Sequence, residues 1–156
     1  MRHVIFLVGK DRYALPLDAV REVVLAPDRY TRVPHAGLSV KGVMTLRGRV
    51  VPVVDLARLL VSNPLERETS AGNSPQKIVL LELTRRDLGL LVTEVEGIEP
   101  IEQVFPAPIV VAPGGFDRPH TTSRLVRGLT RVKELPATVL DLQGLDTAVA
   151  SAFATE

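Results

Sequence analysis

The chain has 156 residues, an apolar fraction of 46% and a formal net charge of +1 at neutral pH. This size and composition fit one ordinary domain with enough Val, Leu and Ile to fill a core. The near-zero charge, together with four Phe, two Tyr and no Trp, argues against a nucleic-acid binder. Cysteine is absent, which excludes disulfides and thiolate zinc sites.

The first half of the sequence predicts two β-hairpins. Residues 4–8 and 13–17 are apolar runs separated by turn residues, and Asp18 stands where the N-cap of a short helix over residues 19–24 is expected. Residues 40–46 and 50–54 flank a turn that contains Gly48, which predicts the second hairpin. Asp55 is expected to cap another short helix. The polar residues 62–75 then predict a surface loop.

The second half repeats this order. Residues 77–83 and 88–92 predict a hairpin, and residues 95–98 correspond to 19–23. Residues 106–122 hold an insertion of irregular structure. Residues 125–132 and 137–140 predict a further hairpin, in which Pro136 indicates an edge strand, and residues 142–154 a C-terminal helix. Short strands with Gly and Pro turns favour a mainly β fold of two pseudo-repeated small barrels. Residues 1–61 and 76–156 are the expected barrel halves of one domain, joined by the loop 62–75.

The repeat is visible in the residues themselves. Residues 40–60 and 126–145 each contain an apolar residue, a basic residue and a glycine, with Asp-Leu thirteen positions after the glycine. Gly42 and Asp55 correspond to Gly128 and Asp141, at an offset of 86, whereas residues 14–23 correspond to 89–98 at an offset of 75. A duplicated β unit without a catalytic signature indicates a binding module with a groove between its halves.

Enzyme chemistry finds little support. One Asp in each half resembles the dyad of aspartic proteases, but Asp55 and Asp141 are each followed by Leu rather than by the small hydroxyl residue and glycine that a dyad needs. Helix capping is the favoured interpretation of both. The three histidines lack metal-ligand spacing, and no nucleophile elbow or phosphate-binding loop is present. We therefore expect no enzyme activity, no metal and no cofactor.

Other residues are candidates for partner binding. Arg47 lies in a tight Leu-Arg-Gly turn, where its guanidinium is either a solvated hairpin tip or a bidentate ligand for a partner's carboxylate. Val20, Val23 and Val95 either fill the core or line the groove between the halves. No apolar run reaches membrane-spanning length, and residues 3–8 are too short for the core of a secretory signal. These patterns predict a soluble, cytoplasmic protein.

The segment VKGVMTLRGRVVPVVDL resembles the CheW-like domain of bacterial chemotaxis, whose hallmark is a glycine, a Leu-Arg-Gly turn and a proline-containing strand that ends in Asp-Leu. The resemblance extends over nearly the whole chain, through FLVGKDRYALPLDAVREVV, IVLLEL, LGLLVTEVEGI, LVRGLTRV and TVLDLQGL. It implies two five-stranded barrels on a common hydrophobic core, and a non-enzymatic adaptor that is recruited to receptor arrays.

The same resemblance implies partners and residues. Family members bind the regulatory domain of a CheA-type histidine kinase and the cytoplasmic tip of chemoreceptors, whose helices lie in the groove between the barrels. Arg47 matches the family's turn arginine, Glu22 its helical acid, Val20 an apolar groove position and Val95 the counterpart in the second half. Gly42, the hallmark glycine, and Val23 complete the expected partner-binding set. The alternative is a regulator that binds one array partner and sequesters it or blocks assembly.

Overall fold

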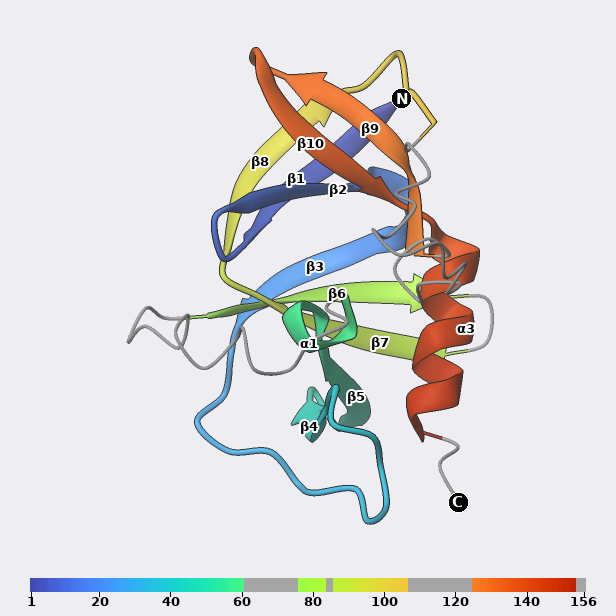
Figure 1. Ribbon diagram of the computed structural model, residues 1–156. Coiled ribbons are helices and arrows are strands. Elements are labelled where there is room, and N and C mark those ends of the chain that lie inside the picture. Colours follow the sequence, from blue (N-terminus) through green and yellow to red (C-terminus); the bar gives the residue numbers. More distant parts are fainter. Residues whose placement is uncertain (61–75, 84–85, 107–124, 154–156) are drawn as a thin grey trace, which may run out of the picture.

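The computed structural model describes residues 1–60, 76–83, 86–106 and 125–153 of the chain. Its strands are β1 (Arg2–Val8), β2 (Asp11–Pro16), β3 (Val20–Leu25), β4 (Val40–Leu46), β5 (Arg49–Asp55), β6 (Lys77–Leu83), β7 (Arg86–Val92), β8 (Glu94–Pro100), β9 (Val126–Val132) and β10 (Leu135–Leu140). The helical segments are η1 (Leu17–Ala19), α1 (Leu56–Leu60) and α3 (Leu142–Phe153) (Figure 1). The fold is mainly β, as predicted.

The strands form two five-stranded sheets, one above the other in Figure 1. Sheet A has the order β8-β1-β2-β10-β9, and sheet B has the order β3-β6-β7-β5-β4. Each sheet therefore takes strands from both halves of the sequence. The expected assignment of one barrel to residues 1–61 and the other to 76–156 is wrong, because β2 pairs in parallel with β10 and β5 pairs in parallel with β7.

The two sheets are related by the repeat that the sequence predicts. Exchanging β1 with β6, β2 with β7, β3 with β8, β4 with β9 and β5 with β10 converts one strand order into the other. The registers correspond as well, since Val53 pairs with Gly89 in sheet B and Val139 with Ala14 in sheet A. These partners are separated by the same offsets of 86 and 75 positions that the sequence shows. The pseudo-repeat is confirmed, but its hairpins are exchanged between the sheets: the first hairpin of each half lies in the same sheet as the second hairpin of the other half.

A glycine in each sheet lets a connecting segment cross an edge strand. Thr31 exchanges two backbone hydrogen bonds with β4, at 2.9 and 2.8 Å, and Phe105 exchanges two with β9, at 2.8 and 2.7 Å. A Cβ atom on Gly42 would lie 2.5 Å from the Thr31 oxygen, and one on Gly128 only 2.3 Å from the Phe105 oxygen. Only glycine allows this approach. These bridges, rather than a continuous ladder, link the two edges of each curled sheet.

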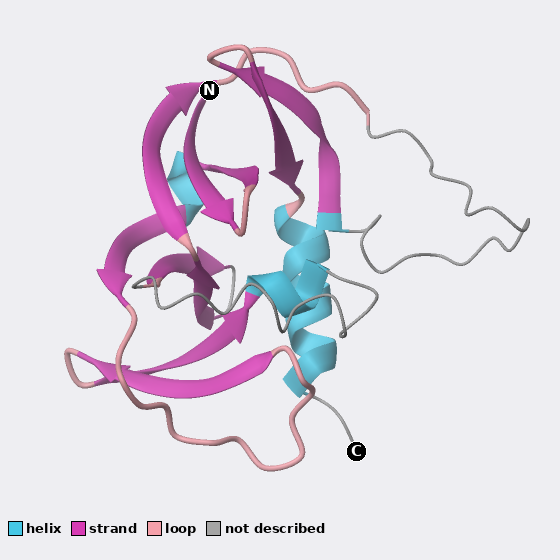
Figure 2. Cartoon of the chain, turned by 60° about the vertical axis from the view of Figure 1, so that its left-hand side comes forward, coloured by secondary structure: helices cyan, strands magenta, loops and turns pink. Residues whose placement is uncertain are grey.

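Figure 2 shows the strands of the two sheets with the long helix α3 running beside them. Apolar clusters lie inside each sheet and between the sheets. Sheet A curls around one that includes Ile5 and Val139, and sheet B around one that includes Val53 and Ile78. The largest cluster joins residues of both sheets with Leu145 and Val149 of α3. This central cluster is the common hydrophobic core that the resemblance implied.

Several local predictions need correction. Residues 20–25 form strand β3 rather than a helix, and its residues alternate between half-buried and exposed, as the β-branched residues of the segment favour. Asp18 is not an N-cap, since it lies within the 3₁₀ turn η1, whose N-cap position is Pro16. Residues 95–98 belong to β8. Pro136 lies on an interior strand, but at a position before the pairing of β10 with β2 begins.

Other expectations fall partly or wholly outside the described residues. The predicted loop over residues 62–75 lies entirely outside them, as does most of the predicted insertion over residues 106–122. The C-terminal helix is observed as α3, which starts where the sequence predicts and is described to Phe153. The repeat therefore accounts for the described strands without reference to these segments.

Candidate protein-docking site

The β4–β5 turn holds Arg47 in a fixed orientation. Arg47 and Gly48 have φ angles of +52° and +80°, respectively. Positive values at both central residues of a two-residue hairpin loop are the signature of a type I′ turn, whose twist matches that of the flanking strands. Glycine adopts a positive φ without strain, whereas the Cβ atom of Arg47 makes this conformation unfavourable. The turn directs the Arg47 side chain toward β3.

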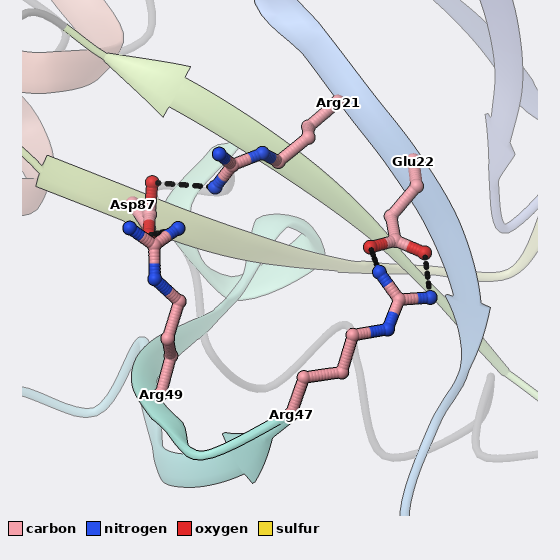
Figure 3. Close-up of polar contacts among 5 residues, drawn as sticks. All are labelled: Arg21, Glu22, Arg47, Arg49 and Asp87. Carbon is pink, nitrogen blue, oxygen red and sulfur yellow. Dashed lines mark hydrogen bonds and ion pairs between the residues drawn. The ribbon is translucent and has the colours of Figure 1, made fainter.

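Arg47 forms a bidentate ion pair with Glu22 of β3. Nη1 donates to Oε1 at 2.6 Å and Nη2 donates to Oε2 at 3.0 Å (Figure 3). The Arg47 side chain is 72% exposed, whereas that of Glu22 is 26% exposed. A pair this exposed contributes little to stability, but its two parallel hydrogen bonds orient the guanidinium. The structure thus brings together the two charged residues of the predicted site, with Glu22 on a strand rather than on a helix.

A second charged group lies beside this pair. Asp87, near the start of β7, accepts hydrogen bonds from Arg21 at 3.5 Å and from Arg49 at 3.4 Å (Figure 3). Sequence reasoning missed this group, because Arg21, Arg49 and Asp87 come from three separate hairpins or strands and meet only when β3 and β5 lie on either side of the β6–β7 hairpin. The only local signal of Arg49 and Asp87 was polarity at a turn, and Arg21 stood within the segment predicted as a short helix.

These charged residues surround a hollow of about 220 Å³. Leu46, Val51, Leu80 and Leu81 provide its apolar part, while the five charged residues of Figure 3 line the rest. Three arginines and two carboxylates leave one positive charge in excess. An apolar surface with an ordered charged rim is suited to another protein, where the apolar part supplies affinity and the rim sets orientation. We call this surface the Arg47 hollow.

The remaining predicted site residues lie elsewhere. Val20 and Val95, equivalent in the pseudo-repeat, are half-buried and pack against the central cluster, which favours the core interpretation. Val23 is 37% exposed on β3. Gly42 is buried and allows Thr31 to cross β4, which is a structural task.

Asp55 and Asp141 cap helices, as the favoured interpretation predicted. Asp55 Oδ1 accepts a hydrogen bond from the Ala57 N–H at 3.1 Å, and Asp141 Oδ1 accepts one from the Gln143 N–H at 3.0 Å. Each carboxylate is thus engaged with the first turn of its own helix.

Two further findings apply to the described residues alone. Within these ranges, no three His, Asp or Glu side chains gather as a metal site would require. No helix in the same ranges has the length and apolarity needed to cross a membrane.

The duplicated sheets and the Arg47 hollow define a class of protein: a duplicated β module with a shaped, charged surface. Comparison with known proteins identifies the family within that class. The model of the CheW-like domain matches residues 2–149, so the chain belongs to the CheW-like family. The resemblance noted in the sequence is confirmed.

Individual relatives agree with this assignment. The chain is 33% identical to Protein PilI of Pseudomonas aeruginosa over 94 residues, which cover 60% of this chain and 49% of that protein. It is 24% identical to the probable chemotaxis protein CheW of Rhizobium etli over 142 residues, covering 91% and 84%. For the chemotaxis protein CheW of Klebsiella aerogenes, identity is 27% over 107 residues, covering 67% and 61%. The match thus spans about half the length of PilI.

A solved structure shows the same fold. The crystal structure of the scaffolding protein TtCheW from Thermoanaerobacter tengcongensis superposes with a TM-score of 0.72 at 24% identity. The superposition covers 90% of this chain and 84% of that one. That protein is described as a scaffolding protein, and the relatives from Rhizobium etli and Klebsiella aerogenes as chemotaxis proteins.

Proposed function

We propose that this protein is a signalling adaptor that couples chemoreceptors to a CheA-type histidine kinase in a chemosensory array. Its partners are the regulatory domain of the kinase and the cytoplasmic tip of the receptor, and it works in the cytoplasm, where the array recruits it. Family membership and the names of relatives, which include chemotaxis and scaffolding proteins, support this role.

The observation that carries the proposal is the oriented Arg47 guanidinium at the rim of the Arg47 hollow. Both of its Nη atoms bind Glu22, yet the side chain is 72% exposed and remains accessible to a partner. Leu46, Val51 and Leu80 supply the adjoining apolar contact. The mechanism is geometric: an adaptor that binds both partners holds the kinase where the receptor's conformation biases its activity.

The test is calorimetric titration of the full chain with the kinase regulatory domain and, separately, with a receptor-tip fragment from the same organism. We expect Arg47→Glu to weaken binding of at least one partner by about 10- to 100-fold, because it places a carboxylate against Glu22 and removes the rim cation. The matched control is Lys10→Glu, which makes the same change of charge in the exposed β1–β2 turn. Unchanged affinity of Arg47→Glu for both partners would contradict the proposal.

A charge exchange separates two roles of Arg47. The double variant Glu22→Arg with Arg47→Glu restores an ion pair with its direction reversed. Recovery of binding shows that the pair acts by ordering the rim, whereas continued loss shows that Arg47 itself contacts a partner's carboxylate. Far-ultraviolet circular dichroism is used to check that each variant keeps its sheet content.

The number of partners bound at once distinguishes the adaptor from a regulator that binds a single partner. An adaptor forms a ternary complex, so sedimentation of the chain with both partners gives one species that contains all three components. Binding of each partner only in the absence of the other, or of one partner alone, instead assigns a role in sequestration or in blocking assembly.

A further inference from the structure

One buried titratable side chain has no part in the proposed docking site. His3, on β1, is 3% exposed and lies at the end of sheet A. Its Nδ1 lies 3.1 Å from the Met1 carbonyl oxygen, which assigns the proton of the neutral ring to Nδ1. Nε2 is buried and has no hydrogen-bond partner among the residues that the structure describes. Protonation of the ring would place a charged N–H at that unpartnered position.

The pseudo-repeat provides an internal comparison for this residue. His3 pairs with Pro16 on β2 and with Glu99 on β8. Ile78, its equivalent in sheet B, pairs with Leu91 and Val24. Each of these three residues of sheet B lies 75 positions from its counterpart in sheet A. Ile78 is fully buried in the apolar cluster of sheet B. Sheet A therefore carries an imidazole at a position that sheet B fills with an aliphatic core residue.

Within the described part of the chain, the surroundings of His3 offer the charged ring no compensating partner. The terminal ammonium of Met1 and the guanidinium of Arg127 on β9 both repel the positive charge of a protonated ring. From β8 comes Glu99, but its carboxylate binds Lys133 at 3.1 Å. The paired residue on β2 is a proline, and the adjoining Ile101 is apolar and buried.

We propose that His3 is a proton-sensitive lock on sheet A: the neutral ring closes the end of its apolar core, and protonation releases the start of β1 from β8. The released contacts include the backbone hydrogen bond from the Ile101 N–H to the Met1 oxygen, 2.9 Å long. The lock acts in sheet A and uses none of the residues of the Arg47 hollow. Its success or failure is thus independent of the proposed docking function.

The direction of the pH effect follows from burial. Loss of solvation, reinforced by the two nearby cations, lowers the pKa of His3 below its ordinary 6.5, while the hydrogen bond to Met1 opposes this in part. Between the lowered pKa and 6.5, the unfolded chain binds the proton and the folded chain does not. Stability therefore falls as the pH drops through this window, by at most about tenfold in the unfolding equilibrium constant per pH unit for one proton. Above 6.5 the lock has no effect.

Urea unfolding between about pH 7.5 and pH 5 tests the lock. The chain has three histidines, so His3→Ile removes the lock with the residue that sheet B uses, while the double variant His35→Asn with His120→Gln leaves His3 as the sole histidine. Asn suits position 35, where φ is +61°. We expect the wild type and the double variant to share the loss of stability below pH 6.5, and His3→Ile to lose much less. Equal pH dependence in His3→Ile and the wild type overturns the proposal.

Measurements on the unmodified protein keep the test decisive if His3→Ile does not fold. The ring Cε1 resonance of His3, followed by NMR, is expected to titrate with a pKa below 6.5, and a value of 6.5 or higher contradicts the lock. Amide hydrogen exchange is expected to accelerate at low pH more in β1 and β8 than in their counterparts β6 and β3, after correction for intrinsic rates. Equal acceleration in both pairs of strands also overturns it.

Discussion

Asp141 couples the end of a strand to the start of a helix. Its Oδ1 accepts hydrogen bonds from the backbone N–H groups of Gln143 at 3.0 Å and Gly144 at 3.4 Å, which satisfies donors that the first turn of α3 would otherwise leave unpaired. We expect Asp141→Ala to lower the free energy of unfolding by about 0.5–2 kcal/mol, as loss of an N-cap usually does. Asp141→Asn keeps an acceptor oxygen and is the control. Urea denaturation measures both, and equal losses in the two variants would contradict the capping role.

Gly128 is required for close approach rather than for an unusual backbone angle. A Cβ atom there would lie 2.3 Å from the Phe105 oxygen and 2.6 Å from Val104 Cγ1, so alanine forces the crossing segment away from β9. We expect Gly128→Ala to destabilise the fold by about 1–3 kcal/mol, the usual range for overpacking. Gly37→Ala is the matched control, since its added Cβ meets no atom closer than 3.4 Å. If thermal unfolding shows Gly37→Ala to be less stable than Gly128→Ala, the close approach of Phe105 does not require glycine at position 128.

At the scale of elements, the hairpins and caps were predictable because their signals are local. Glycine turns separate apolar runs at residues 40–54, and an acidic residue follows each predicted strand at Asp55 and Asp141. The helical spacing of Ala19, Val20 and Val23 predicted one face of a short helix, but in strand β3 Val20 is half-buried and Val23 is exposed on the opposite face. There the β-branched Val20, Val23 and Val24 decide the outcome by pairing with β6. The partners of β2 and β5 were beyond local reasoning, since parallel pairing joins segments far apart in the chain.

The same distinction applies to the docking site. Arg47 and its turn were predictable from Leu-Arg-Gly, and the resemblance placed Glu22 beside it in function. Arg21, Arg49 and Asp87 were not found, because their contacts depend on the register of three strands in sheet B. Contacts between the hairpins of sheet A were equally beyond prediction, because these hairpins come from opposite halves of the sequence.

At the scale of the whole molecule, the exchange of hairpins makes each sheet depend on both halves of the chain. The first half supplies β1 and β2 to sheet A, and the second half supplies β6 and β7 to sheet B. The central cluster also draws on both, with Phe6 and Leu15 from the first half and Leu140 and Leu145 from the second. Neither half can bury its own share of this cluster alone, so the two sheets are expected to form in one cooperative transition.

Cutting the chain between the halves tests this interdependence. Residues 1–60 alone contain β2 without its partner β10 and β5 without its partner β7, and residues 76–156 alone lack the opposite strands. We expect each fragment, produced separately, to lack a cooperative unfolding transition, because an unpaired hairpin with an exposed apolar face is at most marginally stable. An equimolar mixture should recover the sheet signal in circular dichroism and one shared transition. A fragment that unfolds cooperatively by itself would show that a stable sheet can form from a single half, and would contradict the interdependence of the two halves.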